Sequence, residues 1–312
     1  MLFGIVGNGY VGKATRKLGT TETTNFEELE AYKKMGNHPL GRDFGSLLYW
    51  PLVYDTDKSK CEPEGLVIED LKRCDIVFVC VPTPSLKDGT CDTSIVEEVV
   101  NQLKNLGIEK IIVRSTVPVG TCSKLKVLFM PEFLTEKKWE EDFYNTSEWI
   151  VGIDDVDYGD DLLGSEIGES LGALLNFARY NGYTSGSKII WTSTREAEAC
   201  KLVRNGFLAT KVSFCNEVYN WCKSEGMDHE VVLSLMSLDS RIGSSHTSVP
   251  GTDGKYGFGG TCFPKDAKSL LNQIETHSKS YIVRAAIDRN EEIDRPEKDW
   301  EQLKGRAISE DN

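Results

Sequence analysis

Two short stretches of the sequence carry residue types that could do chemistry, and the first is rich in glycine. Gly7, Gly9 and Gly12 form a G-x-G-x-x-G pattern between an apolar run at 2–6 and a helix-compatible run at 13–18. A dinucleotide-binding turn needs this context: the first glycine makes the turn, the second lets the backbone approach a pyrophosphate, and the third lets the helix pack on the strand. The free amide groups at the start of the helix then face the phosphates. We therefore predict nucleotide binding at residues 7–12.

An acidic residue at the end of the second strand is expected to bind the ribose of such a nucleotide. Asp55 closes an apolar run, and an acid at that position favours NAD over NADP. It lies about twice the usual ~20 residues beyond Gly12, so we expect an insertion at about 19–49. The glutamates within 27–30 have better spacing, but their acidic, helix-like run is typical of a solvated surface.

The glycine turn also fits a second nucleotide motif. Residues 7–13 satisfy the P-loop pattern G-x-x-x-x-G-K, but Ala14 stands where a P-loop has the hydroxyl that holds magnesium. A P-loop ATPase is therefore the weaker alternative, and it predicts magnesium-dependent ATP binding.

The second stretch, residues 257–266, surrounds Cys262. A lone cysteine is more often an inert buried residue than a nucleophile. Here the glycines at 257, 259 and 260 are expected to allow close approach of a ligand, Pro264 to fix the loop, and Lys265 to supply positive charge that favours the thiolate. Asp266 follows four residues after the cysteine and lies on the same side if a helix begins there. These neighbours make Cys262 a candidate nucleophile.

Two further pairs of polar residues have helical spacing. Glu132 and Glu136 are four positions apart, as are Lys201 and Asn205, so each pair would present two polar groups to one side of a helix. Surface pairing is the ordinary explanation. Lys201 lies among apolar neighbours, however, and we expect it to point into a site.

The elements that must position these residues alternate along the chain. Apolar runs without alternation, as in strands buried on both faces of a parallel sheet, occur at 2–6, 52–54, 76–81 and 111–113, and a further strand is expected at 149–153. Helical patterns lie between them at 68–74 and 94–106. The sequence therefore predicts an α/β fold with a Rossmann-like, doubly wound parallel sheet. The Gly- and Tyr-rich segment that ends at residue 188 is expected to be a loop or a short hairpin.

A long helix is expected after this sheet. Ser193 to Glu196 is a capping box, and from there to Gly226 the chain contains one glycine and no proline. This predicts a helix of about 30 residues, ~45 Å long, which we expect to connect two domains and to meet a partner subunit. The expected domains are an NAD-binding domain at 1–190 and a mainly α-helical dimerisation domain at 191–312, whose polar end from 288 onwards is expected to be a solvated helix and a frayed terminus.

Composition disfavours several classes of protein. The chain has 36 Lys and Arg against 49 Asp and Glu, and its net charge of −13 disfavours nucleic acid and anionic lipid as partners. No apolar run approaches the ~20 residues that cross a bilayer, so we expect a cytoplasmic protein without a membrane partner. The nine cysteines include no C-x-x-C pair and the four histidines no H-x-x-x-H spacing, so we expect reduced thiols and no metal site.

Several longer motifs resemble those of the UDP-glucose 6-dehydrogenase family of nucleotide-sugar dehydrogenases. They occur in family order from residue 4 to about 290. The motifs are Cys-Val-Pro-Thr-Pro (80–84), Asp-Gly-Thr-Cys-Asp (88–92), Ser-Thr-Val-Pro-Val-Gly-Thr (115–121), Pro-Glu-Phe-Leu (131–134), Arg-Ile-Gly (241–243) and Gly-Gly-Thr-Cys-Phe-Pro-Lys-Asp (259–266). The resemblance implies a homodimer that uses two NAD to oxidise the C6 alcohol of a nucleotide sugar to a carboxylate, with UDP-glucose giving UDP-glucuronate.

The resemblance also implies roles in this reaction. Cys262 would attack the C6 aldehyde to give a thiohemiacetal, whose oxidation leaves a thioester that water hydrolyses. Lys201 and Asn205 would stabilise the oxyanion. Asp266, with Thr116, would position water or take protons.

Further positions match the family in hydrolysis and in binding. Glu132 resembles the residue that acts as acid or base in thioester hydrolysis. The positions that match NAD-binding residues are Gly7, Gly9, Tyr10, Val11, Gly12, Asp55, Lys60, Thr83, Thr116 and Glu136. The positions that would hold the nucleotide sugar are Phe133, Leu134, Lys201, Asn205, Arg241, Tyr256, Gly257, Phe258 and Gly259, with Arg241 reaching across the dimer.

The chain also departs from the family pattern. Family members usually continue for about another hundred residues into a second Rossmann-like domain, and we expect this chain to be a short form without it. The first domain is expected to be shortened between residues 55 and 71, and Arg114 stands where a lysine is usual. We expect an active enzyme that binds weakly or has an altered substrate.

Alternative substrates are GDP-mannose and a UDP-N-acetylhexosamine, although Phe263 favours UDP-glucose. The alternative function is that of an NAD-binding dimerisation subunit without full activity.

Overall fold

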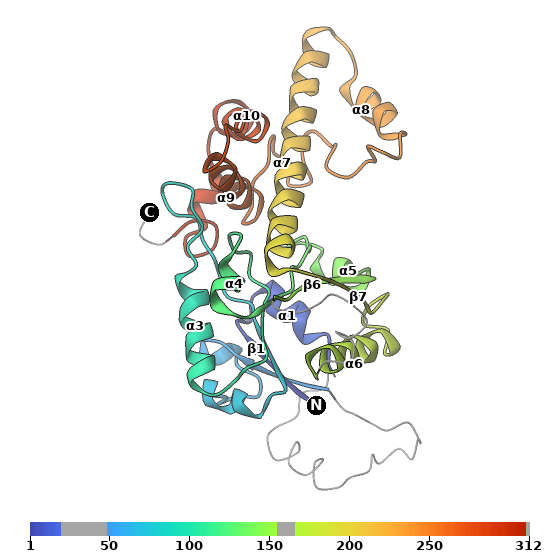
Figure 1. The fold of residues 1–312 in the computed structure, drawn as a ribbon. Helices are drawn as coiled ribbons and strands as arrows, with labels where there is room; N and C mark the ends of the chain where they lie inside the picture. The colour runs from blue at the N-terminus through green and yellow to red at the C-terminus, as the bar shows by residue number, and fades with distance from the viewer. Residues whose placement is uncertain (20–48, 155–165, 310–312) are drawn as a thin grey trace. The chain divides into compact units, whose positions relative to one another are not determined.

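The computed structural model describes residues 1–19, 49–154 and 166–309, and the chain divides into two compact units (Figure 1). The first unit comprises Met1–Pro82, Ser94–Ser115 and Val119–Glu198, and the second comprises Thr83–Thr93, Thr116–Pro118 and Ala199–Asn312. The insertion expected at 19–49 lies almost entirely outside the described residues.

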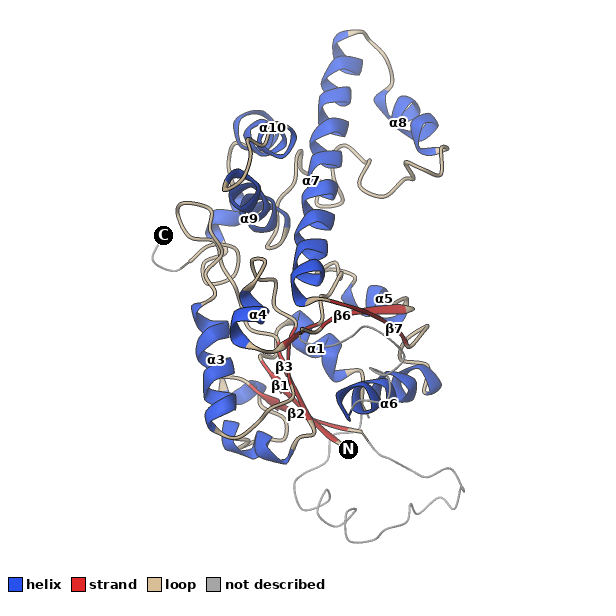
Figure 2. Cartoon of the chain, in the orientation of Figure 1, coloured by secondary structure: helices blue, strands red, loops and turns tan. Residues whose placement is uncertain are grey.

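The first unit is built on a sheet with the strand order β2-β1-β3-β4-β5-β6-β7 (Figure 2). The strands are β1 (Leu2–Val6), β2 (Trp50–Tyr54), β3 (Ile76–Val79), β4 (Ile111–Val113), β5 (Leu128–Phe129), β6 (Glu148–Gly152) and β7 (Lys188–Thr192). The strands from β2 to β5 are parallel, β6 is antiparallel to β5, and β7 is parallel to β6. This arrangement confirms the predicted α/β fold class.

The order of connection sets where a ligand can bind. The chain passes from β1 to β2 on one side and then returns to β3 and β4 on the other. Right-handed crossovers therefore place α1 (Tyr10–Arg16) and α3 (Ser94–Asn105) on opposite faces of the sheet. All residues of β1, β3 and β4 are buried, as in a sheet covered on both faces. The direction changes between β1 and β3, and open α/β sheets bind ligands at the carboxyl ends of the strands beside such a point.

Within its described residues, the first unit contains five further elements. They are η1 (Lys58–Lys60), η2 (Ile68–Arg73), α4 (Thr121–Leu125), α5 (Trp139–Tyr144) and α6 (Glu166–Tyr180). The prediction of loop or hairpin up to 188 is wrong, because the helix α6 forms within this segment. Leu171, Leu174 and Leu175 of α6 share one buried cluster with Phe143 and Trp149. Burial of this apolar side outweighs the low helix propensity of the glycines in α6.

The second unit is helical. Its elements are the greater part of α7 (Thr194–Ser224), then α8 (His229–Ser237), α9 (Phe263–Glu275), α10 (Ile282–Arg289), η4 (Asn290–Asp294) and η5 (Asp299–Gln302). The long helix is confirmed: α7 has 31 residues, and Ser193 Oγ accepts a hydrogen bond from the Glu196 amide at its start. One apolar cluster joins α7, α9 and α10, and a second joins α7 to α8.

The end of the chain differs from the prediction of a solvated helix and a frayed terminus. Trp300 is 2% exposed, and Asn290 is completely buried. The amide of Ser85 donates to the Ala307 carbonyl, which attaches residue 307 to the 83–93 segment of the same unit. Buried residues therefore attach this segment to its unit, which composition alone does not reveal.

Candidate active site

The glycine turn after β1 is shaped by backbone contacts. Gly7 has φ +96°, and a Cβ there would lie 2.6 Å from the Cys80 carbonyl oxygen. A Cβ on Gly12 would collide with the Gly7 carbonyl oxygen, so the third glycine allows α1 to start against the turn. A Cβ on Gly9 would meet no described atom within 4 Å. The turn therefore has the close backbone packing and the open central position that a bound pyrophosphate requires.

A cluster of polar groups lies beside this turn. The amide of Asn8 donates to Asp55 Oδ2 at 2.8 Å, and Asn8 Nδ2 donates to the Lys60 carbonyl at 2.7 Å. Lys60 Nζ forms an ion pair with Asp57 at 3.0 Å, and this pairing raises the pKa of Lys60. The buried Oδ1 of Asn8 accepts no hydrogen bond from the described residues, so this cluster retains an acceptor. The structure thus brings Asp55 and Lys60 to the glycine turn, where a ribose would lie.

The other candidate NAD residues have varied settings. Tyr10 and Val11 are the first two residues of α1. Thr83 and Thr116, which belong to the second unit, lie together, because the Thr83 hydroxyl donates to the Thr116 carbonyl at 2.7 Å. Glu136 is exposed on the loop between β5 and α5.

The prediction that Glu132 and Glu136 share one face of a helix is wrong. Both lie in the loop that follows β5, where Glu132 is buried and Glu136 is exposed. Pro131 has no amide hydrogen, and Glu132 Oε2 accepts a local hydrogen bond from the Leu134 amide at 2.7 Å. This loop, with Phe133 half-buried, places a carboxylate in the interior of the first unit.

In the second unit, Cys262 is the residue that precedes α9. The Asp266 amide donates to the Cys262 carbonyl at 2.9 Å, so the expected helix does begin here. Asp266 is 1% exposed, and each of its oxygens has a partner: Lys265 Nζ at 2.6 Å and Asn205 Nδ2 at 2.6 Å. The carboxylate therefore orients both a cation and an amide beside the candidate nucleophile.

Lys265 supplies the positive charge of this cluster. Burial disfavours its charged form, but attraction from Asp266 and from the Cys91 and Cys262 sulfurs outweighs burial and raises the pKa of Lys265. Its ammonium is therefore charged throughout the neutral range, close enough to Cys262 to favour the thiolate.

The pair of residues expected on the long helix is confirmed in its placement. Lys201 and Asn205 lie one turn apart on α7, and both are buried. Asn205 bonds Asp266, which links this face of α7 to the start of α9. Lys201 is therefore buried and not on the surface, as expected.

The candidate substrate loop at Tyr256–Gly259 has a partly different explanation from the one expected. A Cβ on Gly257 would collide with Asn290 Oδ1, and one on Gly259 would lie 2.7 Å from Arg295 Nη1. Packing within the protein, not approach of a ligand, thus requires glycine at these two positions. Gly260, whose Cβ would meet no described atom within 4 Å, is the one of the three that leaves open space.

The remaining substrate candidates lie at the surface. Tyr256 stacks near Tyr219, and their hydroxyl groups are 3.0 Å apart. The Arg241 side chain is 88% exposed and pairs with Asp239 at 2.6 Å. Its reach across a dimer stays a prediction.

Sequence reasoning missed the residues that hold these sites in place. Asn8 belongs to the turn motif only as an unspecified position, and Asn216, Asn290 and Arg295 lie far along the chain from the loop they contact. A buried asparagine on an apolar face of a helix is a weak sequence signal for such a role. Of these residues, only Asn216 lies in such a setting.

Three findings concern metal ions, disulfides and membranes. Within residues 1–19, 49–154 and 166–309, no group of three or more His, Cys, Asp or Glu side chains could hold a metal ion. None of the nine cysteines, all within the described ranges, forms a disulfide. The helices of the described part of the chain include none with the length and hydropathy to span a bilayer.

Two family models match the chain. The NAD binding domain of the UDP-glucose/GDP-mannose dehydrogenase family matches residues 59–164, and the central domain of that family matches residues 195–292. The first match confirms the prediction of NAD as the cofactor, which the open position at Gly9 also fits.

Curated relatives and solved structures agree with these matches. The chain is 32% identical to a UDP-glucose 6-dehydrogenase of Rickettsia bellii over 72% of this chain and 51% of that protein, and 34% identical to one of Pseudomonas aeruginosa over 71% and 49%. The chain thus spans about half the length of the curated relatives it matches. A UDP-glucose dehydrogenase structure from Pyrobaculum islandicum superposes with a TM-score of 0.65 at 23% identity, covering 93% of this chain and 68% of that one, which supports the fold.

Proposed function

The chain belongs to the UDP-glucose/GDP-mannose dehydrogenase family, and from this premise we propose that it oxidises the C6 alcohol of UDP-glucose to the carboxylate of UDP-glucuronate. NAD, when bound, accepts a hydride in each of the two oxidations. The observation that carries the proposal is the buried network of Asn205, Asp266 and Lys265 beside Cys262.

Cys262 is the proposed nucleophile. Its Sγ adds to the C6 aldehyde formed in the first oxidation and gives a thiohemiacetal. Loss of a hydride and a proton from that adduct leaves a thioester, and water then releases the carboxylic acid and returns the thiol. The Lys265 ammonium supports this role because it stabilises the attacking thiolate.

Fixed donors are assigned to the oxygen that becomes negative on addition. Lys201 and Asn205 lie on one face of α7, and both are buried, so they would act in a medium where a donor is worth more than in water. One N–H of the Asn205 side-chain amide donates to Asp266, and this contact orients the second N–H of the same amide. We assign that second N–H, with the Lys201 ammonium, to the oxyanion.

Proton transfer and hydrolysis are assigned to three further residues. Asp266, with Thr116, positions water or takes protons, and Glu132 acts as the acid or base in thioester hydrolysis. The burial of Asp266 and Glu132 supports this assignment, because carboxylates are rarely buried unless they are paired or have a function.

NAD is assigned to the glycine turn. Gly9 leaves room for the pyrophosphate, Gly7 and Gly12 allow the close packing of the turn, and Asp55 is assigned to the adenosine ribose. The remaining proposed contacts come from Tyr10, Val11, Lys60, Thr83, Thr116 and Glu136.

The nucleotide sugar is assigned to two segments and one arginine. These are Phe133 and Leu134, the loop Tyr256–Gly259, and Arg241 of a second copy of the chain. GDP-mannose and UDP-N-acetylhexosamine remain alternative substrates, since the residues named do not distinguish the bases or the sugars.

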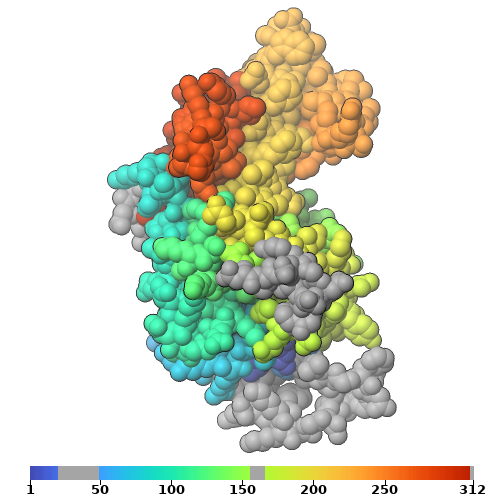
Figure 3. All heavy atoms as spheres, viewed as in Figure 1, coloured from blue at the N-terminus to red at the C-terminus, as the bar shows by residue number. Residues whose placement is uncertain are grey.

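A homodimer is proposed through α7. Val203, Phe207, Phe214 and Trp221 are each more than half exposed. Spacings of four, seven and seven place them on one side of the helix over ~27 Å. The surface of α7 is visible between α8 and the α9–α10 region (Figure 3). An apolar stripe of this length is typical of an interface, and a second copy of the same helix matches it.

Sedimentation should give a dimer, and Phe207→Glu should give a monomer.

Formation of NADH tests the proposed activity. The purified chain, mixed with NAD and a panel of nucleotide sugars, should form two NADH for each UDP-glucose consumed. Calorimetry separates the alternative, because a binding subunit would bind NAD but no nucleotide sugar. Absence of NADH with every sugar in the panel contradicts the proposal.

A further inference from the structure

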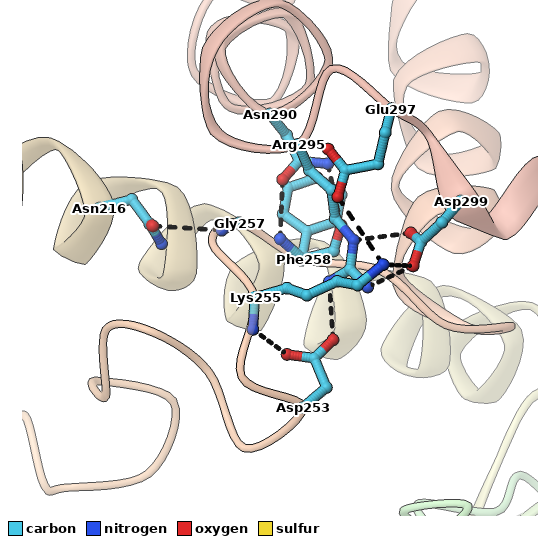
Figure 4. A network of polar contacts seen from close by, with 9 residues as sticks. All are labelled: Asn216, Asp253, Lys255, Gly257, Phe258, Asn290, Arg295, Glu297 and Asp299. Atoms are coloured by element: carbon cyan, nitrogen blue, oxygen red, sulfur yellow. Dashed lines mark hydrogen bonds and ion pairs between the residues drawn. The ribbon is translucent and has the colours of Figure 1, made fainter.

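Polar side chains from the end of the chain hold the loop that leads to Cys262 (Figure 4). We infer that Asn290 and Arg295 are positioning residues for the loop at 253–262, which they hold in its binding shape before a substrate arrives. The inference rests on the proposed function of that loop.

Asn290 binds both main-chain groups of one loop residue. Its Oδ1 accepts from the Phe258 amide at 2.7 Å, and its Nδ2 donates to the Phe258 carbonyl at 2.9 Å. Asn290 is completely buried. In Figure 4 its side chain points at Phe258. Loss of the Asn290 amide therefore removes the partners of both main-chain groups of the buried residue Phe258.

Asn216 supports the neighbouring residue from the other direction. Its Oδ1 accepts from the Gly257 amide at 3.1 Å, and its Nδ2 is held by the Val212 carbonyl at 2.9 Å. The amide groups at 257 and 258 are therefore both engaged by side chains of the protein.

Arg295 connects the start of the loop to the end of the chain. Its Nη1 donates to Asp253 Oδ2 at 2.8 Å, while Nε and Nη2 form a two-point contact with Asp299 at 2.7 and 2.8 Å. Lys255 Nζ also binds Asp299, at 2.6 Å. The Arg295 side chain is only 4% exposed. Burial of a guanidinium is costly, and these contacts are what make it tolerable.

The guanidinium also fixes the loop by its shape. It packs directly against Gly259, where a Cβ would lie 2.7 Å from Nη1 and 2.8 Å from Nε. The chain then runs through Gly260 and Thr261 to Cys262. A displaced guanidinium therefore lets both the substrate loop and the nucleophile move.

The physical consequence is preorganisation. A loop with four glycines loses much conformational freedom when it is ordered. Here that freedom is already lost in the folded chain, so binding of a sugar nucleotide does not have to restrict it. Loss of the holding contacts should weaken binding of the sugar nucleotide while leaving binding of NAD unchanged.

The test compares four variants in the full chain: Asn290→Ala, Asn290→Asp, Arg295→Met and Arg295→Lys. The matched control is Arg284→Met, which removes the exposed pair of Arg284 with Glu275 in the same unit. We expect KM for UDP-glucose to rise about 10-fold in Asn290→Ala and Arg295→Met, with KM for NAD within about 2-fold of the parent. The conservative variants should fall between these and the control.

A second readout does not depend on turnover. Alkylation of Cys262 by iodoacetamide, followed by peptide mass spectrometry over a range of pH, reports whether Sγ still lies beside the Lys265 ammonium. The midpoint of this reaction should move up by ~0.5 pH unit or more in Asn290→Ala and Arg295→Met. Exposed Cys200 serves as the internal reference and should not change.

Each outcome decides the inference. Lower melting temperatures with unchanged KM for the sugar and an unchanged Cys262 midpoint would make these residues merely structural and overturn it. If the alanine and methionine variants do not fold, Asn290→Asp and Arg295→Lys decide by the same two readouts. If the parent makes no NADH from any sugar, the proposed function fails, and the alkylation midpoint alone decides whether the loop is held.

Discussion

The two glycine loops of the chain, at 7–12 and 257–260, are shaped by different kinds of neighbour. In the first, the atoms that exclude a side chain are the backbone carbonyls of Cys80 and Gly7. In the second, they are side chains of Asn290 and Arg295, and Asn290 lies 32 positions beyond the loop residue it binds. Main-chain carbonyls are the same in every residue type, so the first loop can be recognised from its glycine spacing, whereas a loop held by particular side chains elsewhere in the chain cannot.

This difference follows the division of labour that we propose. The first loop binds a cofactor through main-chain groups, so the side chains around it can vary. The second carries a nucleophile whose sulfur must be aimed, and aiming requires side chains that lock its surroundings. Each prediction below separates the two loops or shows that they depend on each other.

Replacement of the nucleophile gives the largest expected effect. Cys262→Ser should lower the rate of acid formation at least about 1,000-fold, because a serine hydroxyl is a poor nucleophile without a strong base. The affinity for NAD should change by less than about 2-fold. The rate is measured by product analysis and the affinity by calorimetry.

If Cys262→Ser loses most of its affinity for NAD, the proposed separation of roles between the two loops is contradicted. A Cys200→Ser variant is the matched control, since Cys200 is an exposed cysteine on α7 with no assigned role. It should keep both the rate and the affinity of the parent.

Two substitutions sharpen the description of the first loop. Gly12→Ala places a methyl group against the Gly7 carbonyl and should lower the free energy of unfolding by about 2 to 3 kcal/mol. Gly9 has φ −72° and open space around it, so Gly9→Ala should change that free energy by less than about 0.5 kcal/mol. It should nevertheless weaken NAD about 10-fold, because the methyl group occupies the place of the pyrophosphate.

Thermal unfolding and NAD titration of both variants test this pair. If Gly9→Ala binds NAD as the parent does, the cofactor does not approach the turn as we describe. If Gly12→Ala is as stable as the parent, the turn is not held by backbone contacts.

The smallest expected effect concerns the ion pairs of the second loop. Hydrogen bonds from Arg295 hold the pKa of Asp299 below its ordinary value. A carboxyl with a lowered pKa stabilises the fold above its unfolded value of ~3.9, and this contribution is lost as the pH falls through its folded value. Arg295→Met should therefore be less stable than the parent by about 2 kcal/mol near neutral pH, with the gap narrowing by about 1 kcal/mol below pH ~4.

Urea unfolding of both proteins at several pH values measures this gap. A gap that stays constant as the pH falls would mean that packing of the guanidinium, and not its charge, holds the loop. Arg284→Met should show a gap near zero throughout, because exposed ion pairs contribute little.

Much of the first unit was predictable because its signals are local. Strands buried on both faces appear as continuous apolar runs, and the capping box at Ser193 marks the start of α7. By contrast, α6 was not predicted, because its glycines are typical of a loop. Its stability comes from burial of Leu171, Leu174 and Leu175 against the sheet. The spacing of Glu132 and Glu136 was misleading because Pro131 and a local hydrogen bond to Leu134 favour a loop.

The candidate site was predictable to the extent that its residues lie in one motif or one helix turn. Cys262, Lys265 and Asp266 are adjacent in sequence, and Lys201 and Asn205 are four positions apart. The contact of Asn205 with Asp266 joins two helices and has no sequence signal. The burial of Arg295 was the least accessible feature, because a charged terminus is ordinarily solvated.

Direct detection of a covalent intermediate tests whether Cys262 carries the sugar during the second oxidation. A Glu132→Gln variant, which should hydrolyse the thioester slowly, is mixed with NAD and UDP-glucose labelled in the sugar, and the reaction is stopped with acid. We expect label on the Cys262 peptide only when NAD is present, and no label in Cys262→Ser. Formation of UDP-glucuronate with no label on Cys262 at any time would contradict this role.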